Sequence, residues 1–250
     1  MTILTAILLF IAAFLSGAVN AIAGGGTFLT FGALSLVGVS PIMANATSSI
    51  TQFPGYVTST LAYRREIAMM WRKSIGYVII SAIGALAGAV LLISLDNPSF
   101  RALVPWLLLA ATALFAAGPW LKPSGDKAAD KGRSSLLSAV AQFVTSLYGG
   151  FFGAGMGIMM LATLGLTERG DYHRLNALKN LLSIVIAAVS IAVFTSSGVV
   201  SWYHAAIMVP AVAAGGYSGV WAARRFPQPL IRALVVAVGL SLAVYYFTTG

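Results

Sequence analysis

The sequence contains no cysteine among its 250 residues. This absence excludes a disulfide-stabilised scaffold, an iron–sulfur cluster held by thiolates and a catalytic thiol. It also provides a natural background for the introduction of single cysteines as labels.

Charged residues are scarce as well, at 8% of the chain, whereas about 25% is usual for a soluble domain. Hydrophobic residues make up 59%, and apolar runs long enough for a bilayer core of about 30 Å recur along the whole length. A water-soluble fold is therefore excluded. The composition predicts an all-α, polytopic membrane protein that has the lipid bilayer as its surroundings.

Only six residues are acidic, and we expect all six to lie in loops: Glu66, Asp96, Asp126, Asp130, Glu168 and Asp171. A proton-coupled carrier usually needs a titratable group within the membrane, and a metal carrier needs ligands there. An enzyme would need a nucleophile with a base or a metal, and only a weak serine–lysine pairing at Lys179 is available. We therefore expect no cation transport, no enzymatic activity, no metal site and no cofactor.

Basic residues are absent from the start of the chain, where nothing precedes Arg64. The apolar N-terminus thus lacks the charged region of a signal peptide, and a similar apolar arm begins again at Leu136, where no signal can be. The net charge of +9 arises from short basic clusters between apolar segments. Lipid headgroups and membrane topology explain such clusters, so we expect no nucleic-acid partner.

The sequence matches itself without a gap when it is shifted by 131 residues. The matching pairs include glycines, asparagines, tryptophans and prolines: Gly24 with Gly155, Gly26 with Gly157, Asn45 with Asn176, Trp71 with Trp202, Gly84 with Gly215, Gly88 with Gly219, and Pro98 with Pro229. The tetrapeptide RALV also occurs at both 101–104 and 232–235. One constant offset indicates a duplication, which is how many membrane transporter folds are built.

The duplication divides the chain into a membrane repeat at 1–121, a polar linker at 122–133 and a second membrane repeat at 134–250. Equivalent loops of the two repeats differ in charge, because 64–73 holds four basic residues and 195–204 holds none. Lysine and arginine in short loops stay on the cytoplasmic side. The sequence therefore predicts two repeats of inverted topology.

Inversion requires an odd number of crossings in each repeat. Three apolar spans are recognisable in each: 41–62, 74–94 and 101–120, then 175–196, 205–222 and 230–248. The glycine-containing segment before them must then enter and return to the same side as a re-entrant hairpin. This topology places the linker and 14 of the 15 basic residues in the cytoplasm, leaves Arg101 outside, and makes both termini periplasmic.

Glycines mark the expected tips of the two hairpins, at Gly24–Gly26 and at Gly153–Gly157. The apolar arm at 27–38 has about 12 residues, or roughly 18 Å as helix, which is too short to cross. Non-helical backbone at this depth must be buried in protein or line a watery cavity. We expect short helices that start near Thr27 and Ile158 to direct unpaired N–H groups and positive dipole ends at one anion site.

Polar residues of the spans that follow the bends complete the expected site. The residues that we expect to bind the anion are Gly24, Gly25, Gly26, Thr27, Asn45, Ser48, Ser49, Gly155, Gly157, Asn176, Lys179 and Asn180. Lys179 stands where the first repeat has Ser48, so we expect only the second repeat to supply a positive charge to the site. Three alternatives stay open: the bend glycines serve only helix packing, the two asparagines only join helices, and Lys179 extends to the cytoplasmic interface.

These residues resemble the sulfite exporter TauE/SafE family of membrane permeases. The resemblance lies in SGAVNAIAGGGTFLTFGALSLVGVSPIMANATSS (16–49) and in GFFGAGMGIMMLATL with LNALKN, followed by Trp202 and GGYSG. It implies a permease that moves sulfite or organosulfonates across the bacterial inner membrane, often outward, with the two bends, Asn45 and Asn176 along the route. Met156 departs from the pattern, because the first repeat has a glycine there.

Three functional hypotheses follow for this chain. The first is a carrier of a small sulfur-containing anion that works by alternating access between the two repeats. The second is an anion channel with the same glycine-bend site, which saturable counterflow would exclude. The third is a membrane scaffold that transports nothing, which the absence of anion uptake and of a ligand-induced thermal shift would favour.

Overall fold

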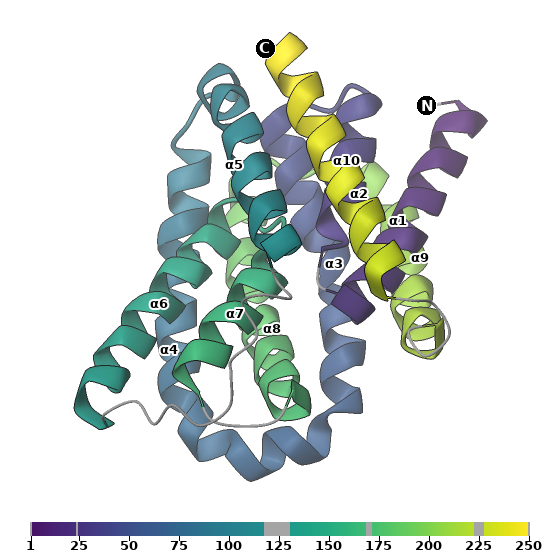
Figure 1. The fold of residues 1–250 in the computed structure, drawn as a ribbon. Helices are drawn as coiled ribbons and strands as arrows, with labels where there is room; N and C mark the ends of the chain where they lie inside the picture. The colour runs from purple at the N-terminus through teal and green to yellow at the C-terminus, as the bar shows by residue number, and fades with distance from the viewer. Residues whose placement is uncertain (1, 24, 118–130, 169–171, 223–227, 250) are drawn as a thin grey trace.

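The structure is a computed structural model that describes residues 2–23, 25–117, 131–168, 172–222 and 228–249. These residues form ten α-helices, and no strand occurs among them (Figure 1). The helices are α1 (Ile3–Ala23), α2 (Thr27–Leu36), α3 (Pro41–Ala62), α4 (Arg64–Ile93), α5 (Asn97–Ala117), α6 (Lys131–Phe151), α7 (Met156–Thr167), α8 (Tyr172–Ser196), α9 (Trp202–Ala222) and α10 (Gln228–Thr249). The all-α class is confirmed, while most of the expected linker at 122–133 lies outside the described residues.

Three helices are long and apolar enough to cross a membrane by length and composition. Their apolar segments are Ile3–Asn20, Ser74–Ile93 and Arg174–Ser196. Large hydrophobic side chains such as Ile79 and Ile83 are exposed on the outside of the bundle. Because a continuous apolar surface is unfavourable in water and matched by lipid tails, these helices indicate a multi-pass membrane protein.

The segment Arg64–Lys73 was expected to be a loop, and this expectation is wrong. Only Tyr63 separates α3 from α4, so the basic segment forms the first turns of α4 and Glu66 lies within a helix. Figure 1 shows these turns across the lower end of the molecule. Arginine, glutamate, alanine and methionine all favour helix, which explains why the chain is helical again directly after Tyr63.

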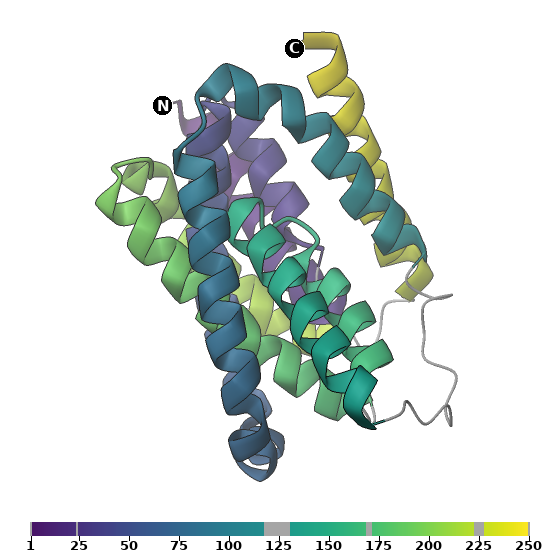
Figure 2. The ribbon, with the colours of Figure 1, turned by 90° about the vertical axis from the view of Figure 1, so that its left-hand side faces the viewer.

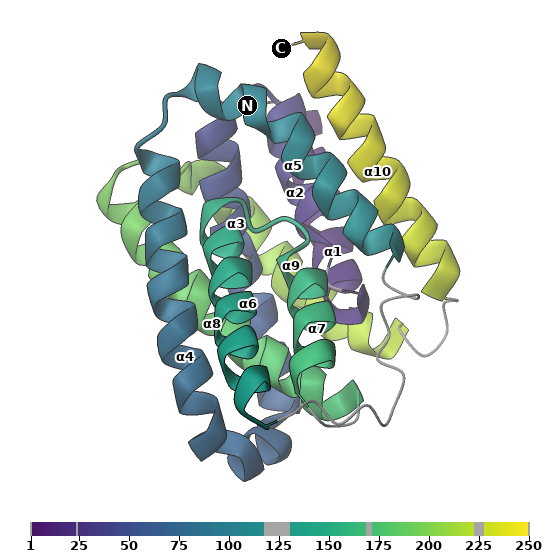
Figure 3. The same cartoon turned by 60° about the vertical axis from the view of Figure 1, so that its left-hand side comes forward.

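Each glycine region separates two helices that lie side by side. In the first half α1 ends at Ala23 and α2 begins at Thr27, and in the second half α6 ends at Phe151 and α7 begins at Met156. Figure 1 shows α1 and α2 in the upper part of the molecule, and Figure 3 shows α6 and α7 beside each other in the lower part. The two pairs therefore approach each other from opposite ends.

Helices that correspond under the 131-residue offset make corresponding contacts: α1 packs on α9 and α6 packs on α4. Glycines let these backbones come close. A methyl group at Gly88 would lie 2.0 Å from the carbonyl oxygen of Leu147, and one at Gly215 would lie 1.9 Å from that of Phe14. Such distances leave no room for any side chain, so these two glycines are required for helix packing.

Two helix pairs complete the bundle. α3 and α8 lie against each other, and α5 packs on α10. Figure 2 shows α5 and α10 running side by side along one flank of the molecule. Aromatic rings join this flank to the hairpins, because the ring of Phe152 lies 5.4 Å from Phe31 of α2 and 6.2 Å from Phe100 of α5.

Candidate functional site

The first bend lies against α1, and this close approach explains the glycine at position 26. A methyl group at Gly26 would lie 1.9 Å from the carbonyl oxygen of Ser16. The hydroxyl of Ser16 in turn donates a 2.6 Å hydrogen bond to the carbonyl oxygen of Gly26. Gly25 is buried beside it, and Gly24 lies outside the described residues. The start of α2 at Thr27 agrees with the sequence-based prediction.

The second bend contains two glycines with left-handed backbone. Gly153 has φ +72° and Gly155, which directly precedes α7, has φ +79°, a conformation that other residues adopt only at a cost. α7 begins at Met156 rather than near Ile158, so Gly157 belongs to the first turn of the helix and not to the bend. Within the described residues the N–H groups of Gly155 and Gly157 have no acceptor. Such N–H groups have no acceptor within the helix because they belong to its first turn.

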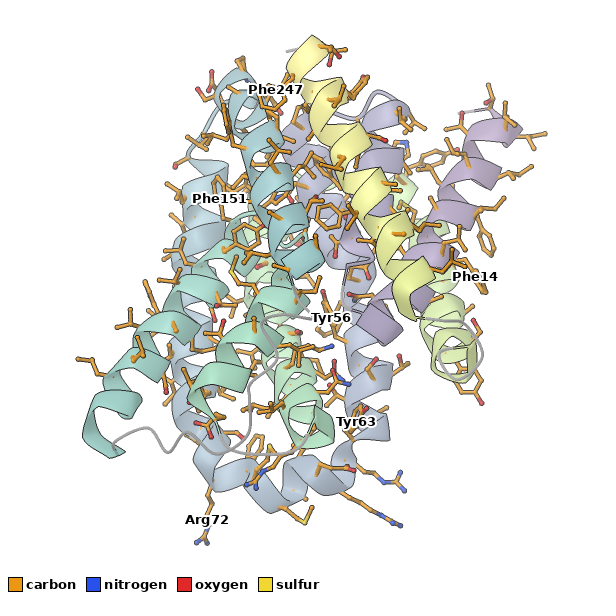
Figure 4. The ribbon with its side chains drawn as sticks, in the orientation of Figure 1. Phe14, Tyr56, Tyr63, Arg72, Phe151 and Phe247 are labelled. Atoms are coloured by element: carbon orange, nitrogen blue, oxygen red, sulfur yellow. The ribbon has the colours of Figure 1, made fainter. Side chains whose placement is uncertain are left out.

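The two bends meet at a small internal cavity between α3 and α8. The lining residues come from both halves: Thr27, Ser49, Gln52 and Tyr56 from the first, and Gly149, Gly153, Met156, Ile186, Ala187 and Ser190 from the second. Figure 4 places Tyr56 about midway between the two ends of the molecule. The cavity offers about 10 Å³ to the centre of a water molecule, which is room for roughly one water.

Polar side chains of the first half form a continuous hydrogen-bond network behind this cavity. The amide nitrogen of Gln52 donates to the hydroxyl of Ser16 at 2.6 Å and to that of Thr30 at 3.3 Å. The hydroxyls of Thr30 and Ser48 lie 2.6 Å apart, and the amide of Asn20 donates to Gln52 at 3.3 Å. The network joins α1, α2 and α3, so the first bend is held by its own half.

Asn45 and Asn176 correspond in sequence but make different contacts. The side-chain amide of Asn45 donates a 2.8 Å hydrogen bond to the carbonyl oxygen of Phe151, the last residue of α6. That of Asn176 donates to the hydroxyl of Tyr63 at 3.1 Å, and Figure 4 shows Tyr63 nearer the lower end of the molecule. Asn45 thus supports the second bend from α3, whereas Asn176 joins α8 to the end of α3.

Lys179 is buried in the protein, with 5% of its surface exposed. No ion pair or hydrogen bond joins its side chain to the described residues. Asn180 beside it is buried as well. Lys179 lies about three turns before Ser190, which lines the cavity on the same helix. A buried ammonium without a counterion is costly, and an anionic ligand is one means of neutralising it.

No carboxylate belongs to the residues that line the cavity. Glu168, which directly follows α7, accepts a 2.5 Å hydrogen bond from the hydroxyl of Tyr77 on α4. This contact fastens the end of the second hairpin to α4. The lining itself consists of hydroxyl groups, an amide, backbone and apolar side chains.

Of the predicted site residues, Thr27 and Ser49 line the cavity, while Ser48 is engaged in the first-half network. Sequence reasoning missed Tyr56, Ser190 and Met156 as lining residues. Met156 is the residue that replaces a glycine of the repeat, and Ser190 follows Lys179 at helical spacing. Both features can be read from the sequence, but only the packing of α7 against α8 brings the two side chains to the same cavity.

Comparisons with known proteins agree with this architecture. Proteins named probable membrane transporter match most of the chain. One from Sinorhizobium (ORF9) is 28% identical over 94% of this chain and 90% of its own length, and one from Haemophilus influenzae is 29% identical over 94% and 91%. YfcA of Escherichia coli, a further probable membrane transporter, is 26% identical over 97% of this chain and 90% of its own length.

The sequence model of one membrane transporter family covers nearly the entire chain, from residue 9 to residue 246. That range includes both bends, the cavity between them and all ten helices in whole or in large part. The chain belongs to the sulfite exporter TauE/SafE family.

Proposed function

We propose that this membrane transporter carries a small sulfur-containing anion, sulfite or an organosulfonate, out of the cell across the bacterial inner membrane. The anion binds between the two glycine bends, and Lys179, about three turns away on α8, supplies the positive charge on its route. One observation carries the proposal above the others. Two helix starts, one from each half, meet at a small cavity that has hydroxyl groups and an amide but no carboxylate in its lining, and α8, which also lines the cavity, carries a buried lysine.

Electrostatics supports an anionic substrate. The starts of α2 and α7 place positive dipole ends near the cavity, and the N–H groups of Gly155 and Gly157 lack acceptors within the described part of the chain. Lys179 adds a full positive charge. A cation in the same place would be repelled by all three features. Sulfite and sulfonates offer several oxygen acceptors to such donors.

The proposal includes two repeats of inverted topology, each with one re-entrant hairpin and three spanning helices. In it α1, although long enough by itself to cross, is the entering arm of the first hairpin. The pairing of α1 with α9 and of α6 with α4 supports it, because inverted repeats exchange partners in this way. The opposite approach of the two hairpins in Figures 1 and 3 supports it too. Arg72, at the lower end in Figure 4, would then be cytoplasmic, and both termini periplasmic.

The size of the cavity favours a carrier over a channel. Room for about one water is too little for sulfite, so an anion passes this point only if the hairpins move. Alternating access supplies that movement when one repeat rocks against the other. A channel with the same site requires a conformation in which this point is open to both sides at once.

Reconstituted protein provides the test. Proteoliposomes loaded with unlabelled sulfite should accumulate labelled sulfite by saturable counterflow, which a channel does not show. Lys179→Ala should abolish this flux while the protein remains folded in detergent, and Arg72→Ala, which removes an exposed charge, should leave it intact. Normal flux in Lys179→Ala would refute the countercharge. If the wild-type protein shows neither anion uptake nor a thermal shift with any sulfur oxyanion, a scaffold replaces the carrier.

A further inference from the structure

One face of α8 carries three buried polar side chains at helical spacing. Lys179 and Ser183 are four residues apart, and Ser190 follows seven residues later, so all three lie on the same side of the helix. Their exposed fractions are 5%, 0% and 2%. Ile186 and Ala187 stand between the two serines on that side, and together with Ser190 they line the central cavity.

None of the three polar groups has a protein partner among the described residues. The hydroxyl oxygens of Ser183 and Ser190 are fully buried without a hydrogen bond, and Lys179 makes neither an ion pair nor a hydrogen bond there. Buried polar groups are almost always satisfied, so three unsatisfied groups on one helix face need an explanation. All three can donate a hydrogen bond, and an anion accepts from each of them.

The corresponding face of α3 gives the contrast. Ser48 and Gln52 occupy the positions of Lys179 and Ser183 in the first repeat, and both are hydrogen-bonded within their own half. Their partners Ser16 and Thr30 correspond to Leu147 and Leu161 in the second repeat, which offer no acceptor. The first repeat therefore uses its donors to hold the bend, and the second repeat leaves its donors free.

We propose that this face of α8 is the cytoplasmic half of the anion path. Lys179 and Ser183 form an inner subsite, and Ser190 donates a hydrogen bond to the anion in the central cavity. Lys179 and Ser183 lie about 6 Å apart along the helix axis, and Ser190 lies about 10 Å beyond Ser183. One sulfite cannot span that distance, so the two places are occupied in turn. This inference rests on the function proposed above.

The direction in which α8 runs through the molecule fits the proposed path. Its first residues lie toward the lower end of the molecule, where α4 begins (Figure 1), and its middle reaches the cavity. Arg64 and Arg65 are the first two residues of α4. An anion that enters from this end meets first the surface arginines, then the buried ammonium of Lys179, then the two hydroxyls. α7 packs against α8 along this stretch, with Met160 and Leu164 in the same buried cluster as Leu178 and Leu182. Movement of the second hairpin would open the path.

Counterflow of labelled sulfite in proteoliposomes tests the two serines. Ser183→Ala and Ser190→Ala should each raise the KM for sulfite about tenfold, the loss expected for one hydrogen bond to a charged ligand. Ser183→Thr and Ser190→Thr keep the hydroxyl and should restore most of the affinity. The matched control is Ser59→Ala, because Ser59 is the position of α3 that corresponds to Ser190. Its KM should stay at the wild-type value.

Thermal unfolding without anion separates a ligand contact from a structural one. Replacement of a buried hydroxyl that has no partner removes no hydrogen bond, so the Tm of both alanine variants should be unchanged or higher. The rise in Tm that sulfite produces in the wild-type protein should shrink in both. A lower Tm together with an unchanged KM would assign the serines a structural role and overturn the inference.

A labelling experiment tests access to the inner subsite directly. Ser183→Cys, on this cysteine-free chain, should react with a membrane-impermeant sulfonate-bearing thiol reagent added from the cytoplasmic side, and sulfite should slow the reaction. Ser59→Cys should not react from that side. Absence of modification in a variant that still transports would overturn the path along α8. If the wild-type protein shows no sulfite counterflow at all, the proposed function itself is refuted.

Discussion

The side-chain amide of Asn45 on α3 donates a 2.8 Å hydrogen bond to the carbonyl oxygen of Phe151, where α6 ends. This contact joins the two halves at the tip of the second hairpin. The carbonyl groups of the last helical turn have no partner within the helix, so a side-chain donor from outside satisfies one of them. A residue of the first repeat thus stabilises the end of α6, just before the second bend.

Asn45→Ala should therefore destabilise the protein more than Asn176→Ala does. Loss of the amide leaves the buried carbonyl of Phe151 without a donor, at a cost of about 1–3 kcal/mol. Asn176 donates to the half-buried hydroxyl of Tyr63, which other groups or water can satisfy. Thermal unfolding in detergent measures both variants. Equal decreases in Tm would show that the hydrogen bond to Phe151 contributes no more to stability than the one to Tyr63.

Gly26→Ala should prevent the first hairpin from packing. The added methyl group would lie 1.9 Å from the carbonyl oxygen of Ser16, and backbone cannot yield by that amount without moving α1 away from α2. We expect a loss of folded protein upon detergent extraction. Gly76→Ala is the matched control, since nothing lies within 4 Å of the added group. That variant should gain up to about 1 kcal/mol from helix propensity.

Met156→Ala should change which anions are accepted. The Met156 side chain is buried and lines the central cavity, so its truncation enlarges the space next to Ser190 and the second bend. Under the proposed function, the KM for ethanesulfonate should fall several-fold relative to the KM for sulfite. Some stability is lost, about 2–5 kcal/mol for such a truncation. Met156→Leu keeps the volume and should retain the wild-type ratio, and an unchanged ratio in both variants would place the binding site elsewhere.

Single cysteines test the topology. Under inversion, Lys127→Cys in the linker and Arg72→Cys at the α3–α4 end label from the cytoplasmic face. Ser197→Cys, in the exposed turn between α8 and α9, labels from the periplasmic face. An impermeant thiol reagent applied to intact cells and to inside-out vesicles distinguishes the periplasmic face from the cytoplasmic face. Labelling of positions 127 and 197 from the same face would refute the inverted arrangement.

Much of the architecture could be predicted from the sequence because the bilayer restricts what a chain can do. The span 41–62 coincides with α3, and the break before Thr27 was placed correctly by its glycines. The Arg64–Lys73 segment was not, because charge was taken to mean a loop, whereas helix propensity continues through it. The start of α7 was missed by two residues, because the left-handed Gly153 and Gly155 complete the bend before Gly157.

The candidate site was predicted only in outline. Thr27 and Ser49, two of the residues predicted to bind the anion, line the cavity, whereas Ser48 has a hydrogen-bond partner in Thr30. A sequence pattern shows that a polar residue lies on a helix face, not whether another helix already satisfies it. Conversely, a sequence pattern does not show which residues a cavity will expose, as Tyr56 and Ser190 illustrate. Each is an ordinary residue in the sequence, and each becomes part of the lining because α3 and α8 pack together there.

The sequence alone determined the helical membrane class, the duplication and the positions of the two bends. These follow from local properties: hydropathy, a constant offset, and glycines that no long helix would favour in its interior. Only the tertiary structure decided which buried polar groups are hydrogen-bonded within the described part of the chain and which are not. Hydrogen bonds between side chains far apart in the chain engage the donors of the first half, whereas leucines stand at the equivalent positions of the second half and leave the Ser183 hydroxyl without a partner among the described residues.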